Sequence, residues 1–392
     1  MRRPRVLFVG HAADRTGPPI GLLHYLRWIV DHTDVEPQIL LLNGGDLLGD
    51  YAEIGPVTLL DEWNPSPLFG ALESAVDWGA ARRWQVPVHR AGMRRRLRRI
   101  ARPDLVYVNT AWTLRALDYL PAGLPVVSAV HELEVGLDFH LPPAVHDTLV
   151  DRPVHWIAVS EAVAGNLVAN HGLDRDRISV HYEMIDARRV PESIRQARRA
   201  ELDADADTVL VAASGLAHWR KAPDLFVRLA RQVVDRHRGR DVRFVWIGGD
   251  HSSAETASLR HDVAAAGLGR QFLLVPHVAD PLEWFAAMDV FVLTAREDAF
   301  PLVCLESAAQ DVPVVCFDNG GMPEFVGGTE QECGAVVPYP DLGAMADAVS
   351  AFVDDPQRRR RAGQAAGTRV RSCYDIPAVA PGLWATVERF LP

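Results

Sequence analysis

The chain has 392 residues, a formal net charge of −10 at pH 7 and 48% hydrophobic residues, so we expect two or three globular domains with buried cores. The acidic balance argues against a general nucleic-acid binder, which needs a basic surface. Lys221 is the only lysine among 41 basic residues and it follows an arginine, which excludes a Walker A loop and argues against a pyridoxal phosphate enzyme.

Short apolar runs alternate with helical patterns along the whole chain. Buried strands are predicted over residues 6–9, 38–42, 105–109, 126–130, 156–160, 208–213, 242–247, 272–275, 290–294 and 312–317. These runs are continuous rather than alternating, which is typical of parallel strands covered on both faces. The sequence therefore predicts an α/β fold with two doubly wound, Rossmann-like parallel-sheet domains.

One segment without a strand pattern interrupts this alternation. Residues 186–207 are rich in Arg, Glu, Ala and Asp, and we interpret them as a linker helix. The predicted N-terminal domain with its linker covers residues 1–200, and the second domain covers residues 201–375. A last helix over residues 376–392 could pack back on the first domain. Because ligands of such sheets bind beyond the carboxyl ends of the strands, an active site is expected in a central cleft that the two domains face.

Several features bear on the cellular compartment. The apolar run after Met1–Arg5 is shorter than that of a signal peptide, and no apolar stretch approaches the ~18 residues of a membrane helix. The four cysteines lack metal-ligand spacing and are expected to be reduced thiols in the cytoplasm. Seven arginines between Arg90 and Arg102 favour a solvated amphipathic helix, with attachment to an anionic membrane surface as the less favoured alternative.

Two loops of the first half carry candidate binding residues. In the loop after the first strand, Gly17 precedes Pro18, Pro19 and a predicted helix, so a phosphate or a sugar could approach the backbone at the helix start. A plain turn is the alternative. His131 follows the strand over 126–130 and is expected to face a ligand, although a structural histidine bonded to the backbone is also open.

The loop after residue 213 contains two adjacent cations, Arg220 and Lys221. Arginine offers a planar fork and lysine a compact charge, so the pair suits a diphosphate. A solvated pair is the alternative. In a chain with a single lysine, its place in this loop argues for a function.

Carboxylates follow a strand of the second half in a similar way. Glu297 and Asp298 come after the strand over 290–294, and Glu306 lies on the next predicted helix. They could accept hydrogen bonds from sugar hydroxyls, whereas surface charges or helix caps are the alternative.

These residues resemble a known family. Asp298 and Glu306, with seven residues between them, are similar to the E-x7-E signature of the family 4 glycosyltransferases, which have the GT-B fold. Residues 219–226, 319–324, 334–341 and 159–161 resemble four further stretches of that family. The chain departs from the pattern at Asp298, where the family has Glu, and at Ser214-Gly215, where it often has Gly-Arg. Two prolines also remove N–H groups from the first loop.

The resemblance implies a retaining transferase that moves a sugar from a nucleoside-diphosphate sugar to a hydroxyl acceptor, with no metal or other cofactor. Implied catalytic residues are His131, Asp298, Arg220 and Lys221. Implied donor-binding residues are Gly17, Arg220, Lys221, Glu297, Asp298, Phe300, Pro301, Leu302 and Glu306. Implied acceptor-binding residues are His11, Asn109 and His131.

The acceptor is left open by the sequence. A secondary metabolite of aminoglycoside or oligosaccharide type and a surface polysaccharide both fit the composition, which is rich in Ala and Arg and points to a bacterium of high GC content. A nucleotide-sugar epimerase of the same fold and a non-catalytic sugar-nucleotide-binding protein are the alternative functions.

Overall fold

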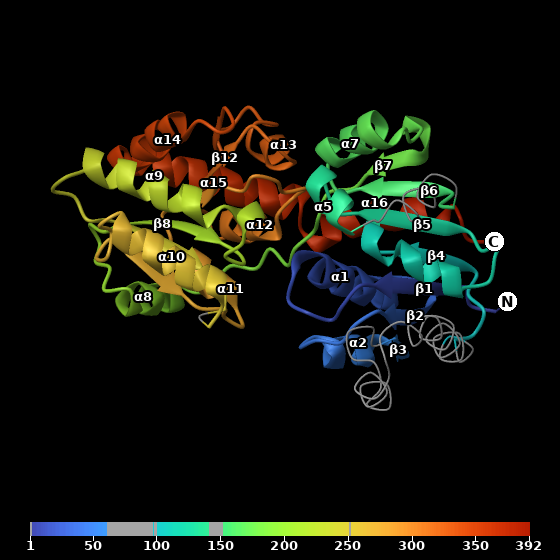
Figure 1. Cartoon of the computed structure of the whole chain (residues 1–392). Helices are drawn as coiled ribbons and strands as arrows, with labels where there is room; N and C mark the ends of the chain where they lie inside the picture. The colour runs from blue at the N-terminus through green and yellow to red at the C-terminus, as the bar shows by residue number, and fades with distance from the viewer. Residues whose placement is uncertain (1, 61–96, 98–99, 141–151, 251) are drawn as a thin grey trace, which may run out of the picture. The chain divides into compact units, whose positions relative to one another are not determined.

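The computed structural model describes residues 2–60, 97, 100–140, 152–250 and 252–392. The chain forms two compact units. The N-terminal unit comprises Met1–Val159, Val163–His181 and Ala380–Pro392, and the C-terminal unit comprises Ser160–Ala162 and Tyr182–Val379. Each unit contains its own parallel sheet flanked by helices (Figure 1).

The sheet of the N-terminal unit has the strand order β3-β2-β1-β4-β5-β6-β7 within the described residues. All of its pairings are parallel. The strand order reverses between β1 and β4, where the loops after two adjacent strands diverge and ligands of such sheets bind. The elements are β1 (Arg5–Gly10), α1 (Gly17–His32), β2 (Glu36–Leu41), α2 (Leu48–Ile54), β3 (Val57–Leu59), β4 (Leu105–Val108), η1 (Ala111–Tyr119), β5 (Val126–Val130), α5 (Glu134–His140), β6 (His155–Ala158), α7 (Glu161–His171), η2 (Arg175–Arg177) and β7 (Ile178–Val180).

The sheet of the C-terminal unit has the order β10-β9-β8-β11-β12-β13, again with parallel pairings, and it reverses between β8 and β11. Its strands are β8 (Val209–Ser214), β9 (Val242–Ile247), β10 (Phe272–Val275), β11 (Val290–Leu293), β12 (Val314–Phe317) and β13 (Gly334–Val337). Its helices are α8 (Glu192–Glu201), η3 (Trp219–Lys221), α9 (Pro223–Arg236), α10 (Ala254–Ala265), α11 (Pro281–Ala287), α12 (Leu302–Ala309), α13 (Met322–Val326), α14 (Leu342–Asp354), α15 (Pro356–Cys373) and the start of α16 (Ile376–Glu388).

The two doubly wound parallel sheets confirm the predicted α/β fold class. Each of the ten predicted strands corresponds to a strand of the structure, with bounds that differ by at most a few residues. Strands β3, β7 and β13, which are three or four residues long and lie at sheet edges, are not among the predicted strands.

The helices of the C-terminal unit begin at residues with a local physical reason. Asp280, Asp341 and Asp355 each accept a hydrogen bond from a backbone N–H of the first turn of the helix that follows. Proline occupies the first turn of α9, α11 and α15, where its missing N–H costs nothing. These residues fix where each helix begins.

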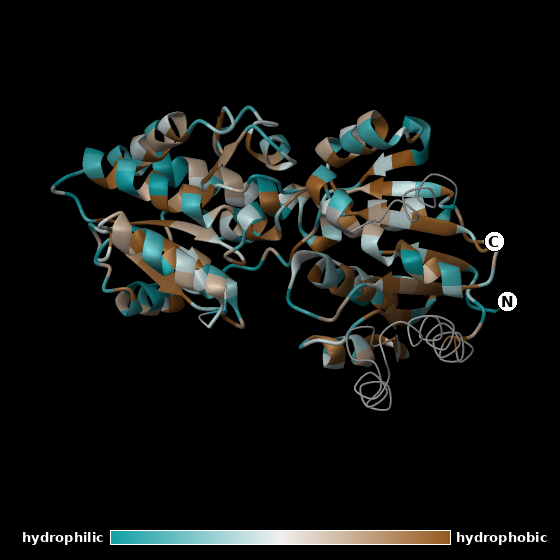
Figure 2. Ribbon diagram, in the orientation of Figure 1, coloured by the Kyte–Doolittle hydropathy of each residue, from teal (hydrophilic) through white to brown (hydrophobic). Residues whose placement is uncertain are grey.

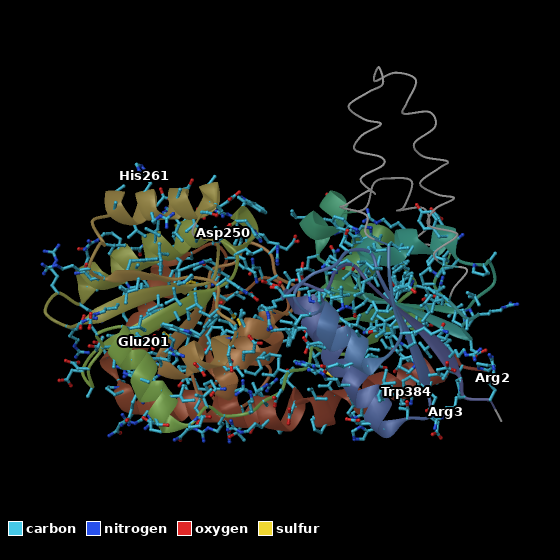
Figure 3. All side chains as sticks on the ribbon, turned by 90° about the horizontal axis from the view of Figure 1, so that it is seen from below. Arg2, Arg3, Glu201, Asp250, His261 and Trp384 are labelled. Carbon is cyan, nitrogen blue, oxygen red and sulfur yellow. The ribbon has the colours of Figure 1, made fainter. Side chains whose placement is uncertain are left out.

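One hydrophobic core of the C-terminal unit lies between its sheet and helices α9, α10 and α14. Phe226 of α9 packs edge-on against Phe244 of β9, with ring centroids 5.4 Å apart. Figure 2 shows the strands as mainly hydrophobic and the outer helix faces as hydrophilic. Polar side chains such as Arg3, Glu201 and His261 are exposed at the surface (Figure 3). In the part of the chain that is described, no helix combines the length and hydropathy that crossing a membrane requires.

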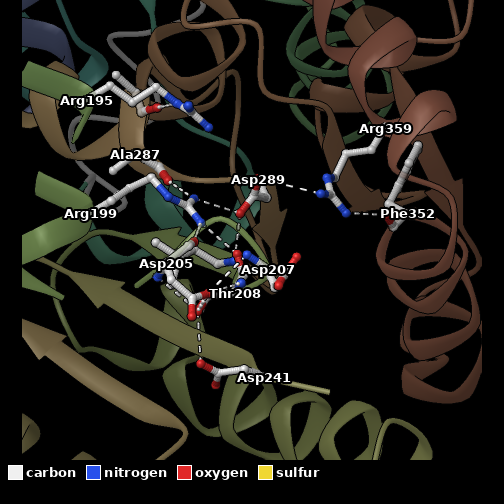
Figure 4. Close-up of polar contacts among 12 residues, drawn as sticks. Arg195, Arg199, Asp205, Asp207, Thr208, Asp241, Ala287, Asp289, Phe352 and Arg359 are labelled. Atoms are coloured by element: carbon white, nitrogen blue, oxygen red, sulfur yellow. Dashed lines mark hydrogen bonds and ion pairs between the residues drawn. The ribbon is translucent and has the colours of Figure 1, made fainter. Parts of the chain in front are cut away.

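Helix α8, predicted as a linker, packs within the C-terminal unit through a buried arginine. Arg199 is 9% exposed. Its guanidinium donates to the carbonyls of Ala287 at 2.9 Å, Asp205 at 2.8 Å and Thr208 at 2.7 Å, and to the Asp289 carboxylate at 3.0 Å (Figure 4). The transition between the units therefore lies at residues 181 and 182, earlier than the predicted boundary at residue 200.

The last part of the chain belongs to the N-terminal unit. Residues Ala380–Pro392 include most of α16. Thr386 of this helix lies 2.8 Å from the His181 imidazole, and the rings of Phe390 and His155 are 5.2 Å apart. The arginine-rich segment 90–102 lies largely outside the described residues, so its predicted helix stays a prediction.

Candidate functional site

The two predicted cations of the C-terminal unit converge on one predicted acid. Lys221 Nζ lies 2.5 Å from Asp298 Oδ2, and an Arg220 guanidinium nitrogen lies 3.4 Å from Asp298 Oδ1. Arg220 also donates to the backbone carbonyl of Glu297 at 3.1 Å. Lys221 and Asp298 are 77 residues apart in the sequence. They meet because the loops after β8 and β11 leave neighbouring strands at the point where the strand order reverses.

This group of charges is sheltered from solvent. The Lys221 and Asp298 side chains are 14% and 10% exposed, whereas Arg220 is 37% exposed. Burial by itself would raise the pKa of the Asp298 carboxyl, but the charges of Lys221 and Arg220 outweigh it and hold this pKa below its ordinary value. Two cations against one carboxylate leave a net positive charge, which suits an anionic ligand.

Glu306 supplies a second carboxylate from α12. Burial raises its pKa from 4.5 to about 7, and the nearby Asp280 carboxylate acts in the same direction. Among the described residues no hydrogen-bond or ion-pair partner for the Glu306 carboxylate is found. A sheltered carboxylate without a partner is costly, so a ligand with hydroxyl groups would find a strong acceptor there.

Glycines after β8 and β9 make room for the Lys221 side chain. A Cβ at Gly215, where φ is 141°, would lie 3.2–3.3 Å from three carbons of the Lys221 stem. A Cβ at Gly248 would lie 2.8 Å from the Gly215 carbonyl oxygen. The Trp246 indole N–H donates to the same carbonyl at 3.1 Å. The stem of Lys221 therefore lies flat across a backbone that only glycine can provide.

The glycine-rich loop after β12 holds the backbone around Asp298. At Gly320, where φ is 64°, an added Cβ would lie 2.1 Å from the Asp298 carbonyl oxygen. At Gly321 it would lie 2.0 Å from the Ala299 carbonyl oxygen. Both positions require glycine because two loops pack backbone against backbone. The motif thus has a structural role in placing Asp298.

Three of the predicted donor-binding residues turn their side chains into the core. Phe300 is 4% exposed, and its ring lies 5.0 Å from that of Tyr182 and 5.6 Å from that of Tyr374, between centroids. Pro301 precedes α12 and is buried, and Leu302, the first residue of that helix, is 6% exposed. These residues could meet a ligand only through their backbone, and their binding roles stay predictions.

The N-terminal unit brings two predicted residues, Gly17 and Asn109, to the start of α1 and places a third, His11, in the loop before it. Gly17 begins this helix. Asn109, 3% exposed at the end of β4, donates from Nδ2 to the Pro18 carbonyl at 2.8 Å. The carbonyl of His11 accepts from Asn43 Nδ2 at 3.2 Å. The Asn109 amide therefore positions the loop after β1, and the predicted acceptor contacts of His11 and Asn109 remain predictions.

His131 follows β5 and has an acidic neighbour that the sequence analysis does not single out. The Glu132 carboxylate accepts from the backbone N–H of His131 at 2.9 Å and of Ala111 at 3.3 Å. Burial raises the pKa of Glu132, although these N–H donors and His131 oppose the rise. Glu132 links the ends of β4 and β5 and places His131. In the sequence, the position of Glu132 directly after His131 at a strand end is the feature that could have indicated its contact with the His131 backbone.

Arg296 is a second residue that the sequence analysis does not assign. Its guanidinium pairs with Asp224 at 2.6 Å, 72 residues away in the sequence. Its backbone carbonyl accepts from Asn319 Nδ2 at 2.8 Å. Arg296 therefore connects the loops after β8, β11 and β12. No local sequence pattern predicts these contacts, because the partners are distant in the chain.

Two family models match the chain. The model described as glycosyl transferases group 1 matches residues 207–355, and the model described as glycosyltransferase family 4 matches residues 54–189. The first range includes the cation pair, Asp298 and Glu306, and the second includes Asn109 and His131.

Curated relatives match over part of their length. The lipopolysaccharide core biosynthesis mannosyltransferase LpsB of Rhizobium meliloti is 30% identical over 229 residues, which is 58% of this chain and 61% of LpsB. A D-inositol 3-phosphate glycosyltransferase of Paenarthrobacter aurescens is 30% identical over 226 residues, 57% of this chain and 55% of that protein. The chain thus covers less than two thirds of these relatives.

Solved structures share the fold over nearly the whole chain. Anabaena HepE in complex with UDP and glucose matches with a TM-score of 0.79 and 17% identity, covering 99% of this chain and 100% of HepE. WaaG, a glycosyltransferase of lipopolysaccharide biosynthesis, matches with a TM-score of 0.73 and 12% identity, covering 97% and 99% of the two chains. At these identities the match shows the fold alone.

Proposed function

Because the chain belongs to the group 1, family 4 glycosyltransferases, we propose that it transfers a sugar from a nucleoside-diphosphate sugar to a hydroxyl group of an acceptor, with retention at the anomeric carbon. The observation that carries this proposal is the convergence of Lys221 and Arg220 on Asp298 at the reversal point of the C-terminal sheet.

We propose that Arg220 and Lys221 bind the diphosphate of the donor. They lie directly before α9, whose N-terminal end adds a partial positive charge. Glu306 accepts hydrogen bonds from the ribose hydroxyls, and Asp298 accepts from hydroxyls of the sugar. Asp298 forms an ion pair with Lys221, so a diphosphate that binds Lys221 competes with this carboxylate for the lysine.

The proposed chemistry depends on stabilising the leaving group. The bond from the anomeric carbon to the diphosphate oxygen breaks, and the acceptor oxygen bonds to the same face of that carbon. The acceptor proton passes to the departing diphosphate. Arg220 and Lys221 act where negative charge develops, which is the arrangement that lowers such a barrier.

We propose that the N-terminal unit binds the acceptor through residues at the reversal point of its sheet, with His131, Asn109 and His11 as contacts and Gly17 beneath the ligand. The named relatives act on the lipopolysaccharide core and on D-inositol 3-phosphate, and HepE was crystallised with UDP and glucose. These names support a polyhydroxylated acceptor, small or glycan, and make UDP-glucose and nucleotide sugars of mannose the first donors to test. All four cysteines are free, which fits a reducing cytoplasm.

The test combines donor binding with turnover. A thermal-shift screen of nucleotide sugars identifies the donor, and release of the nucleoside diphosphate is then measured with a panel of acceptors. We expect Lys221→Ala and Glu306→Ala to lower turnover at least about a hundredfold, the usual loss for one electrostatic stabiliser. Arg231→Ala, at an exposed ion pair of α9, is the control and should keep full turnover.

Other outcomes would reject the proposal. Near-normal turnover in a folded Lys221→Ala or Glu306→Ala variant would exclude the assigned site. Conversion of the donor to its epimer without an acceptor would identify an epimerase. Tight donor binding with no transfer to any acceptor would identify a non-catalytic binding protein.

A further inference from the structure

The turn that carries Arg220 and Lys221 has an unfavourable backbone conformation at its end. Ala222 follows Lys221 directly and adopts the left-handed region, with φ 54° and ψ 54°. This region is disfavoured for a residue with a Cβ atom, and such a conformation persists only where the surroundings hold it. Ala222 is fully buried, so the restraint comes from neighbouring protein groups.

The segment after β11 supplies this restraint. Thr294 Oγ1 donates to the Ala222 carbonyl at 3.1 Å. The Arg296 backbone N–H donates to the Arg220 carbonyl at 2.8 Å, and the Arg296 guanidinium donates to the Trp219 carbonyl at 2.8 Å. Three carbonyls of this four-residue turn are therefore held by residues more than seventy positions away in the sequence.

The Arg296 side chain extends this restraint to the helix that follows the turn. Its two terminal nitrogens contact both oxygens of Asp224, at 3.0 and 2.6 Å, in the first turn of α9. The guanidinium carbon also lies 5.3 Å from the centroid of the Trp219 ring. Arg296 thus joins the start of the turn to the helix that follows it. The hydrogen bond to Asp224 raises the pKa of Arg296, so its charge is permanent.

The conformation of this turn sets the direction in which the Arg220 and Lys221 side chains point. The stem of Lys221, whose ammonium reaches Asp298, lies against Gly215, and Arg220 reaches the same carboxylate from the adjacent position. If Ala222 relaxed to the right-handed region, residues 219–221 would rotate relative to α9, and both cations would move away from Asp298. The Arg296 guanidinium is 18% exposed and bonded to protein groups, which argues against direct contact with a ligand.

We propose that Arg296 is a positioning residue that holds Arg220 and Lys221 in the geometry that receives a diphosphate. This inference rests on the proposed function, because it assumes that the pair binds the donor diphosphate. It assigns the Arg296–Asp224 pair to donor recognition, although neither residue touches the donor.

The test compares ligands that differ only in the second phosphate. Affinities for UDP and UMP, GDP and GMP, ADP and AMP, and dTDP and dTMP are measured by calorimetry on the wild-type full chain, and the pair that binds most tightly is used. Variants are Arg296→Met, Arg296→Lys and Asp224→Asn, with Arg231→Lys as the matched control from a surface Arg–Asp pair. Thermal midpoints show which variants are folded.

We expect Arg296→Met to weaken nucleoside-diphosphate binding about tenfold or more while monophosphate binding changes less than twofold. Arg296→Lys and Asp224→Asn should also weaken diphosphate binding more than monophosphate binding, but by a smaller factor than Arg296→Met. Lysine keeps the charge but lacks the planar fork that contacts both carboxylate oxygens, and asparagine keeps only one of the two oxygens. If Arg296→Met does not fold, these two variants decide the question. The control should bind both nucleotides like the wild type.

Two results would overturn the inference. One is unchanged diphosphate affinity in the folded Arg296 and Asp224 variants. The other is an equal loss of mono- and diphosphate binding, which a general structural role would produce. Lys221→Ala separates the two proposals: if it weakens diphosphate binding and the Arg296 variants do not, only the inference fails. If it has no effect, or if no nucleotide binds the wild type, the proposed function fails and the inference with it.

Discussion

Replacement of Glu306 by glutamine should stabilise the protein above pH 7 and leave its stability nearly unchanged near pH 4.5. Glutamine has the size of the protonated side chain but carries no charge. In the folded protein burial raises the pKa of Glu306 from 4.5 to about 7, with the Asp280 carboxylate as a smaller cause. The wild-type side chain therefore ionises less readily when the chain is folded.

The sign of the effect follows from proton binding in the two states. Below pH 4.5 the Glu306 carboxyl is protonated in both the folded and the unfolded chain, so Glu and Gln are equivalent. Between pH 4.5 and about 7 the folded chain binds more protons than the unfolded one, so wild-type stability falls as the pH rises. Above about pH 7 the full difference between the variant and the wild type is present.

The size of the difference is set by the two pKa values. Each pH unit between them corresponds to ~1.4 kcal/mol, which makes ~3 kcal/mol an upper limit for a fully enclosed carboxyl. Glu306 keeps some contact with solvent, which screens its charge. We therefore expect a gain of about 1–2 kcal/mol in the free energy of unfolding at pH 8.

The assay is urea unfolding at pH 5, 6, 7 and 8, followed by tryptophan fluorescence. Glu330→Gln, at an exposed position of the same unit, serves as the control for the change of side chain. The reasoning is refuted if Glu306→Gln follows the control at every pH or is less stable than the wild type at pH 8. If the variant is more stable but binds nucleotides weakly, the Glu306 carboxylate contributes to nucleotide binding and destabilises the folded protein.

Two further predictions concern the same loops. Asp298→Asn should tighten nucleoside-diphosphate binding by about threefold to tenfold, because Lys221 loses its competing carboxylate, and should lower turnover at least tenfold; weaker diphosphate binding in calorimetry would contradict this. Gly321→Ala places a Cβ 2.0 Å from the Ala299 carbonyl oxygen and should lower the free energy of unfolding by about 3 kcal/mol or more. Gly269→Ala, where nothing lies within 4 Å of the added Cβ, should change stability little, and equal unfolding midpoints for these two variants would refute the steric argument.

The interior strands were predictable because their physical cause is local. A strand covered on both faces needs a continuous apolar run, as in β1 and β8, where nearly every residue is buried. The missed strands β3, β7 and β13 pair on one side only and are partly exposed, so their sequences do not need that pattern.

The domain boundary shows why a local pattern can mislead. The polar composition of α8 indicates a solvent-exposed linker, but Arg199 buries its guanidinium by satisfying three carbonyls and a carboxylate of the C-terminal unit. Burying a guanidinium is costly unless hydrogen-bond partners compensate for the lost water. Two of the four partners of Arg199 come from segments distant in the sequence, so a local pattern does not predict its burial.

The sequence by itself determined the two doubly wound sheets, the loop with the only lysine, and the Asp298–Glu306 spacing, since each depends on residues close together in the chain. Only the tertiary structure decided that Lys221 is paired with Asp298, that Glu132 joins the ends of β4 and β5, and that Arg296 holds the turn at Ala222. These contacts join the ends of different strands, and which strand ends become neighbours depends on the order of strands in the sheet rather than on any local run of residues.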